Sequence, residues 1–160
     1  MRATARRHPA RVRAAHAATA ALLLVTAAVA PAQPPELDYL QFCLGCHRED
    51  GSGSARNGVP DMRGVIGRFA HVPSGRAFLI QVAGVAQAPL DDAALATLMN
   101  WLLPRMDAAG LPADFAPYTA DEVARLRAAR PGDLGALRAQ ALADLAAAGH
   151  VSATAAADPP

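Results

Sequence analysis

The stretch Cys43-Leu44-Gly45-Cys46-His47 decides how the rest of the chain can be interpreted. It contains both cysteines of the 160-residue sequence, three positions apart, and a histidine directly after the second one. On a helix this spacing places the two thiols one turn apart, with the imidazole beside them. In a C-x-x-C-H motif the thiols add to the vinyl groups of a haem, and the imidazole binds the iron. The motif therefore predicts one covalent haem c, held by Cys43, Cys46 and His47.

Other interpretations of the two cysteines have less support in the sequence. A thioredoxin-like redox pair needs a βαβ pattern, and no strand pattern leads into Cys43. A structural zinc site needs four ligands, and the chain has no second cysteine pair. A disulfide between Cys43 and Cys46 would close a very short loop and would therefore add little stability.

The first 32 residues have the pattern of an export signal. Five arginines crowd the N-terminus, an uncharged apolar run follows over about 17–30, and small residues surround Ala30 and Ala32. Cleavage after Ala32 avoids a proline next to the cut bond. A run of about 14 apolar residues is shorter than the ~20 that span a bilayer. We therefore expect residues 1–32 to be a signal peptide, the mature protein to be periplasmic, and no membrane span to remain after cleavage.

Composition limits the possible partners. The precursor has 15 basic and 14 acidic residues, but removal of residues 1–32 takes away five arginines and no acid, which leaves an acidic mature chain. Nucleic-acid binding needs a concentrated basic face, so we do not expect it here. Aromatic residues make up only 4% of the chain. A core with so few large side chains would gain apolar volume from a haem.

Helical patterns follow the signal, and no segment predicts a strand. We expect helices over about 36–44, over 74–82 with Ser74 as cap, and over about 92–103. Asp91 or Asp92 would cap the third helix and Pro104 would stop it. Residues 45–73 are rich in Gly, Ser, Asn and Pro and predict a long loop that a ligand would have to organise. The expected fold class is all-α.

The C-terminal part predicts a helical extension after a haem domain of residues 33–106 and a linker of residues 107–118. Thr119-Ala120-Asp121-Glu122 has the form of a capping box. It opens a helix to about Ala129, and a second helix runs from Asp133 to Gly149. We expect residues 119–149 to cover the haem domain, with a docking arm for a partner as the alternative. The small and polar residues 150–160 predict a disordered tail.

Residues 36–103 resemble the monohaem c-type cytochromes with the class I fold. Tyr39 stands four residues before the first cysteine, where the family has an aromatic residue that packs on the last helix of the haem domain. Trp101 stands where the resemblance places the residue on that helix against which this aromatic residue packs. The fold that the resemblance implies is a cytochrome c fold wrapped around one haem.

The segment Pro60-Asp61-Met62-Arg63-Gly64-Val65-Ile66-Gly67-Arg68 resembles the family loop that follows the haem motif. The resemblance implies that the Pro60 carbonyl accepts a hydrogen bond from the second ring nitrogen of His47. It also implies that Met62 is an apolar wall on the His47 side of the ring, and that Arg68 binds a haem propionate.

The chain departs from the family pattern at the sixth iron ligand. The family usually has a methionine in the loop before the last haem-domain helix, and residues 84–89 contain neither Met nor His. A thioether ligand would favour Fe(II), whereas a second imidazole would favour Fe(III). We favour His71 as the ligand. The other candidates are Met106, Met99, Met62, which we expect on the wrong side of the ring, and an open or water-bound iron beside Gln87.

The resemblance implies an electron carrier and no enzyme. Such a protein passes single electrons through an exposed haem edge to periplasmic redox proteins, for example from a quinoprotein dehydrogenase toward a terminal oxidase. The alternative is a gas- or redox-binding haem module, a sensor or accessory subunit, with an open or weakly held sixth iron position. No catalytic constellation is present in the sequence.

Overall fold

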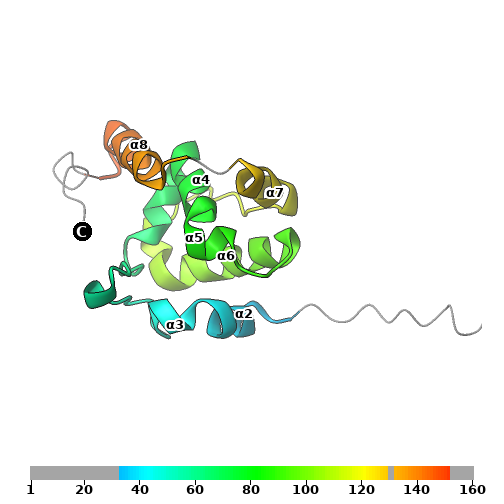
Figure 1. Cartoon of the computed structure of the whole chain (residues 1–160). Helices are drawn as coiled ribbons and strands as arrows, with labels where there is room; N and C mark the ends of the chain where they lie inside the picture. The colour runs from blue at the N-terminus through cyan, green and yellow to red at the C-terminus, as the bar shows by residue number, and fades with distance from the viewer. Residues whose placement is uncertain (1–32, 130–131, 152–160) are drawn as a thin grey trace, which may run out of the picture. The chain divides into compact units, whose positions relative to one another are not determined.

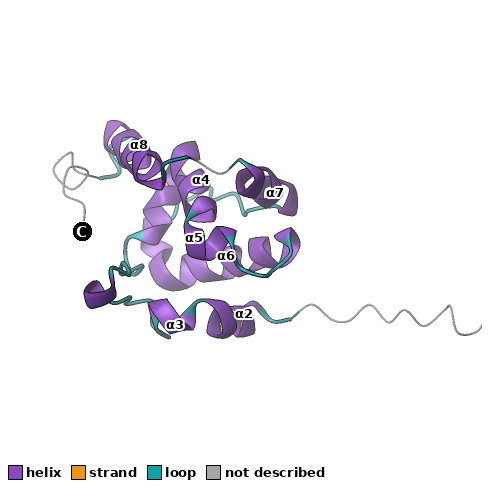
Figure 2. Ribbon diagram, in the orientation of Figure 1, coloured by secondary structure: helices purple, strands orange, loops and turns teal. Residues whose placement is uncertain are grey.

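The computed structural model describes residues 33–129 and 132–151, so the predicted signal peptide of residues 1–32 lies outside the described part. Within that part the secondary structure is helical, and the only strand-like feature is an isolated bridge between Ser54 and Val59. The all-α prediction is confirmed at this level (Figure 2). No described helix is both long enough and apolar enough to cross a membrane.

The helices are short, and α6 is the longest of those described (Figure 1). In chain order they are α2 (Pro35–Phe42), α3 (Leu44–His47), η1 (Ala55–Asn57), η2 (Ile66–His71), α4 (Pro73–Gln81), α5 (Ala83–Ala86), α6 (Asp92–Asp107), η3 (Ala108–Gly110), α7 (Ala120–Ala128) and α8 (Leu134–Ala147).

Two predicted N-caps are confirmed, and a third cap lies at Asp133, where the sequence predicted the start of a helix. The carboxylate of Asp91 accepts a hydrogen bond from the Ala94 N–H at 2.7 Å at the start of α6. Thr119 caps α7, and Asp133 caps α8, each through its side-chain oxygen. These contacts satisfy backbone donors that the first turn of a helix leaves free.

Two predictions about polar side chains at helix starts are wrong. Val72 occupies the cap position of α4, and the Ser74 hydroxyl instead donates to the Asp144 carboxylate of α8. The Glu122 carboxylate does not complete the capping box, because it pairs with Arg76 of α4 at 2.7 Å. Both side chains bind partners far away in sequence, which a local pattern cannot reveal.

The prediction that Pro104 stops α6 is also wrong. The helix continues through Pro104 to Asp107. An internal proline costs a helix about 3 kcal/mol. The added turn buries Met106, and the buried Asp107 carboxylate accepts hydrogen bonds from the N–H groups of Gly67 and Gly110, both at 3.0 Å. These contacts offset the cost of the proline.

The core is built around α6, which contacts α2, η2, η3 and α7. Helix α4 forms a second centre, because it packs on η2, α5, α7 and α8. The fully buried side chains of α6 include Leu95, Leu98, Met99 and Leu103, each at most 2% exposed. The α6 side chains and those of α4 belong to a single hydrophobic cluster.

The predicted extension contributes directly to this cluster. Val123 of α7 and Leu145 of α8 are both 0% exposed. The predicted linker also packs, because the Asn100 side chain exchanges hydrogen bonds with the backbone N–H and C=O of Tyr118 at 2.7 and 2.9 Å. This packing supports the interpretation of residues 119–149 as a cover. Of the predicted tail, His150 and Val151 pack on the protein, and residues 152–160 lie outside the described part.

We predict that Leu145→Ala destabilises the protein by about 2–5 kcal/mol, because it removes a buried side chain and leaves a cavity in the shared core. Leu37→Ala is the matched control, since Leu37 is 49% exposed on α2. It should cost under about 0.5 kcal/mol. Denaturant unfolding followed by circular dichroism measures both. A Leu145→Ala variant as stable as the control would show that α8 is not part of the cooperative fold.

Candidate functional site

The Cys–His motif (residues 43–47) occupies one turn at the junction of α2 and α3. The Cys43 N–H donates to the Tyr39 carbonyl at 2.9 Å, and the Cys43 carbonyl accepts from the His47 N–H at 3.0 Å. Both thiols and the imidazole are therefore held within a single turn of helical backbone. Arg48 ends this turn with a φ of 57°, a left-handed conformation that is uncommon for a residue with a side chain.

Tyr39 anchors the motif to the core. Its ring lies 5.9 Å from the Trp101 ring of α6, centroid to centroid, with 50° between the planes. The pairing that the resemblance implied is therefore present. The Tyr39 hydroxyl donates to the Arg48 carbonyl at 2.5 Å. One side chain thus supports both the helix before the motif and the residue after it.

Both cysteines are free thiols with different surroundings. Cys46 is exposed, whereas Cys43 is half-buried. Burial raises the pKa of the Cys43 thiol, and the charges at Asp38 and Cys46 raise it further. The thiolate is the reactive form, so Cys46 is the more accessible nucleophile of the two.

His47 presents its two ring nitrogens differently. Its Nδ1 atom is buried and has no hydrogen-bond partner. Burial lowers the pKa of His47, and the Pro60 backbone raises it by a smaller amount. Since proline has no N–H, the group that acts on the ring is the Pro60 carbonyl. The structure thus brings Pro60 next to His47, as the resemblance implied, although the contact lacks the geometry of a hydrogen bond.

Two glycines that the sequence analysis did not single out shape this loop. Gly51 and Gly53 have φ values of 77° and 65°. A side chain at Gly53 would collide with the Pro60 carbonyl, and one at Gly51 would collide with the sulfur of Met106. Because both are glycine, the loop can fold back toward His47. The Gly51-Ser52-Gly53 sequence is the pattern from which this tight loop could have been predicted.

The methionine candidates are buried. Met62 and Met106 are each 8% exposed, and both approach Gly51. Met99 is 1% exposed in the middle of α6. Gln87 lies at the surface. Met62 and Met106 are therefore the methionines that lie against the loop after the Cys–His motif, at Gly51.

His71 lies among residues of the C-terminal half. Its Nε2 atom is 3.0 Å from the Gly110 carbonyl oxygen, and its ring stacks on His150 with 3.7 Å between centroids. Ligation of iron through Nε2 would require the contact with Gly110 to break. Arg68 is exposed on η2, and no described residue pairs with its guanidinium. Its role at a propionate stays a prediction.

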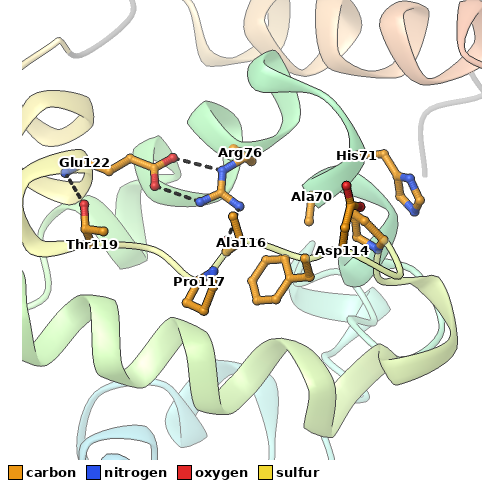
Figure 3. Close-up of a pocket in the computed structure, with 10 residues that line it drawn as sticks. Ala70, His71, Arg76, Asp114, Ala116, Pro117, Thr119 and Glu122 are labelled. Carbon is orange, nitrogen blue, oxygen red and sulfur yellow. Dashed lines mark hydrogen bonds and ion pairs between the residues drawn. The ribbon is translucent and has the colours of Figure 1, made fainter.

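A cleft of about 540 Å³ lies apart from the Cys–His motif (Figure 3). It is lined by His71, the segment before α7, and the Arg76–Glu122 pair. Arg76 is also bonded to the Ala116 carbonyl at 2.9 Å and lies 4.1 Å from the centre of the Tyr118 ring. Because every side of this guanidinium is engaged, we assign the pair a structural role.

In comparisons with known proteins, no family model, curated protein or solved structure matches the chain. Among the described residues, no group of three or more His, Cys, Asp or Glu side chains is arranged to hold a metal ion. The site is therefore interpreted from its own residues.

We predict that iodoacetamide modifies Cys46 at least about threefold faster than Cys43 in the reduced, haem-free protein near pH 8. The reason is the burial of Cys43 and its raised pKa. Asp38→Asn should speed the reaction of Cys43, because it removes a nearby negative charge. Glu36→Gln on the exposed face of α2 is the control and should change neither rate. Peptide mass spectrometry gives both rates, and equal rates in the wild type would contradict the described burial.

Proposed function

We propose that this protein is an exported c-type cytochrome that carries single electrons by means of one covalent haem. The observation that supports this most is the geometry at residues 43–47. Two free thiols and an imidazole share one helical turn, and the imidazole has one buried nitrogen beside a backbone carbonyl. This is the donor set that haem c attachment requires.

The residues fit a haem in distinct roles. The exposed Cys46 and half-buried Cys43 would form the two thioether bonds. Since Nδ1 of His47 is the buried nitrogen, Nε2 would hold the iron. A small shift would let Nδ1–H donate to the Pro60 carbonyl, which fixes the tautomer and raises the basicity of the ring. When bound, the haem would supply an iron that changes between Fe(III) and Fe(II).

Apolar surface near the motif would favour contact with the porphyrin or with partners. Leu37 and Leu40 of α2 are 49% and 40% exposed, and Val65 is 46% exposed. Leu37 and Leu40 are three positions apart and therefore share one face of α2, which we propose as part of a contact surface. We propose periplasmic redox proteins as the partners, with residues 1–32 as the export signal.

The decisive experiment is expression with export, followed by measurement of covalent haem. The wild-type protein should carry one haem that stays attached after denaturation, seen by intact mass and by the absorption spectrum. Cys43→Ala together with Cys46→Ala should abolish attachment, because no thiol remains. Gly45→Ala is the matched control, since a side chain there meets no neighbouring atom. An exported wild-type protein without haem would refute the proposal.

A gas-binding haem module is the second candidate, because residues 84–89 offer no Met or His and His71 is engaged with Gly110 and His150. Carbon monoxide added to the reduced protein separates the two. An electron carrier with a firmly held sixth ligand predicts no prompt Soret shift at neutral pH. If His71 is that ligand, His71→Gln should gain the shift. A shift in the wild type would favour the gas-binding module.

A further inference from the structure

Arg127 of α7 makes four hydrogen bonds to one short segment, residues 86–92. Its Nε donates to the Ala86 carbonyl at 3.1 Å, its Nη2 to the Ala88 carbonyl at 2.9 Å, and its Nη1 to the Leu90 carbonyl at 2.9 Å. The same Nη1 pairs with the Asp92 carboxylate at 2.8 Å. A guanidinium has five N–H donors in a fixed planar fork and can serve four acceptors at once, whereas an ammonium has three donors on a flexible stem.

Apart from Arg127, the 86–92 segment is held mainly by residues next to it in the chain. The N–H groups of Ala86, Gln87 and Ala88 donate to carbonyls of residues 82–85, and the Asp91 carboxylate caps α6. The buried side chains of the segment are Ala86 and Ala88, each a single methyl group, and Leu90 is partly buried against the core. Methyl groups bury little apolar area. Arg127 makes the described side-chain hydrogen bonds that join this segment to a distant part of the chain.

Helix α7 is itself anchored without Arg127. Val123 is 0% exposed in the core. The buried Gln81 side chain of α4 donates from Nε2 to the carbonyls of Leu126 and Ala129 at 2.9 and 2.7 Å, which satisfies acceptors at the end of α7. Loss of the Arg127 side chain would thus free the 86–92 segment and leave α7 in place.

We propose that Arg127 makes α7 a strap over the segment that precedes α6, residues 86–92, which we call the lid because it can open locally. Release of Arg127 opens the lid locally, while α4, α7 and α8 stay folded. Local opening of this kind is typical of segments with few internal contacts. The device is independent of haem and goes beyond the proposed function.

The test is amide hydrogen exchange by NMR on the full-length protein carrying Arg127→Met. The N–H groups of Gln87 and Ala88, which donate to Ala83 and Val85, are the reporters of the lid. Their exchange should become at least about tenfold faster. The N–H of Ala148 at the end of α8 is the reference and should not change.

Arg125→Met is the matched control, because Arg125 is exposed on the same helix and should leave all rates unchanged. Arg127→Lys keeps the charge but loses the planar fork, so it should still accelerate exchange in the lid. Unchanged rates at Gln87 and Ala88 in Arg127→Met, or equal acceleration at Ala148, would overturn the proposal. Full protection in Arg127→Lys would also overturn it.

The same samples keep this proposal separate from the proposed function. Covalent haem is read from their intact mass, and none of the substitutions touches residues 43–47. If the wild-type protein lacks haem and Arg127→Met accelerates exchange in the lid, the cytochrome proposal is refuted and the strap is supported. If the wild-type protein carries haem and Arg127→Met leaves exchange in the lid unchanged, the cytochrome proposal is supported and the strap is refuted.

Discussion

The docking of Tyr39 on α6 determines where the Cys–His motif stands. The phenol ring is 2% exposed and packs on Trp101, while its hydroxyl holds the Arg48 carbonyl. Burial raises the pKa of Tyr39, and the charges at Cys43 and Asp50 add to the shift, so the hydroxyl stays protonated as a donor at neutral pH. Tyr39 is the buried apolar side chain of α2, so this contact is the main attachment of α2 to the core.

The end of α6 organises the long loop of residues 45–73, which the sequence analysis expected a ligand to organise. The Met106 carbonyl accepts from the Gly64 N–H at 3.1 Å, and the Asp107 carboxylate accepts from the Gly67 N–H at 3.0 Å. The Met106 side chain also closes against Gly51. Protein contacts thus order residues 51–67 at three points.

The sequence predicted what depends on neighbours in the chain. The caps at Asp91 and Thr119 and the start of α8 at Asp133 are local and were predicted, and the Tyr39–Trp101 pair followed from a family resemblance. The extension of α6 past Pro104 was missed, because burial of Met106 and Asp107 outweighs the local penalty. Within the candidate site, the motif and the approach of Pro60 were predicted. The positions of Gly51 and His71 were not, since both depend on distant residues.

The order in which the core is completed has a consequence for maturation. Synthesis from the N-terminus presents residues 43–47 early, whereas Val123, Ala141 and Leu145 arrive last. These late residues are all 0% exposed in the finished core, and α4 cannot be fully covered before they arrive. The two thiols are therefore present on a chain whose core is unfinished. The covalent attachment that we propose at the cysteines would have its opportunity in that interval, before the C-terminal helices close the fold.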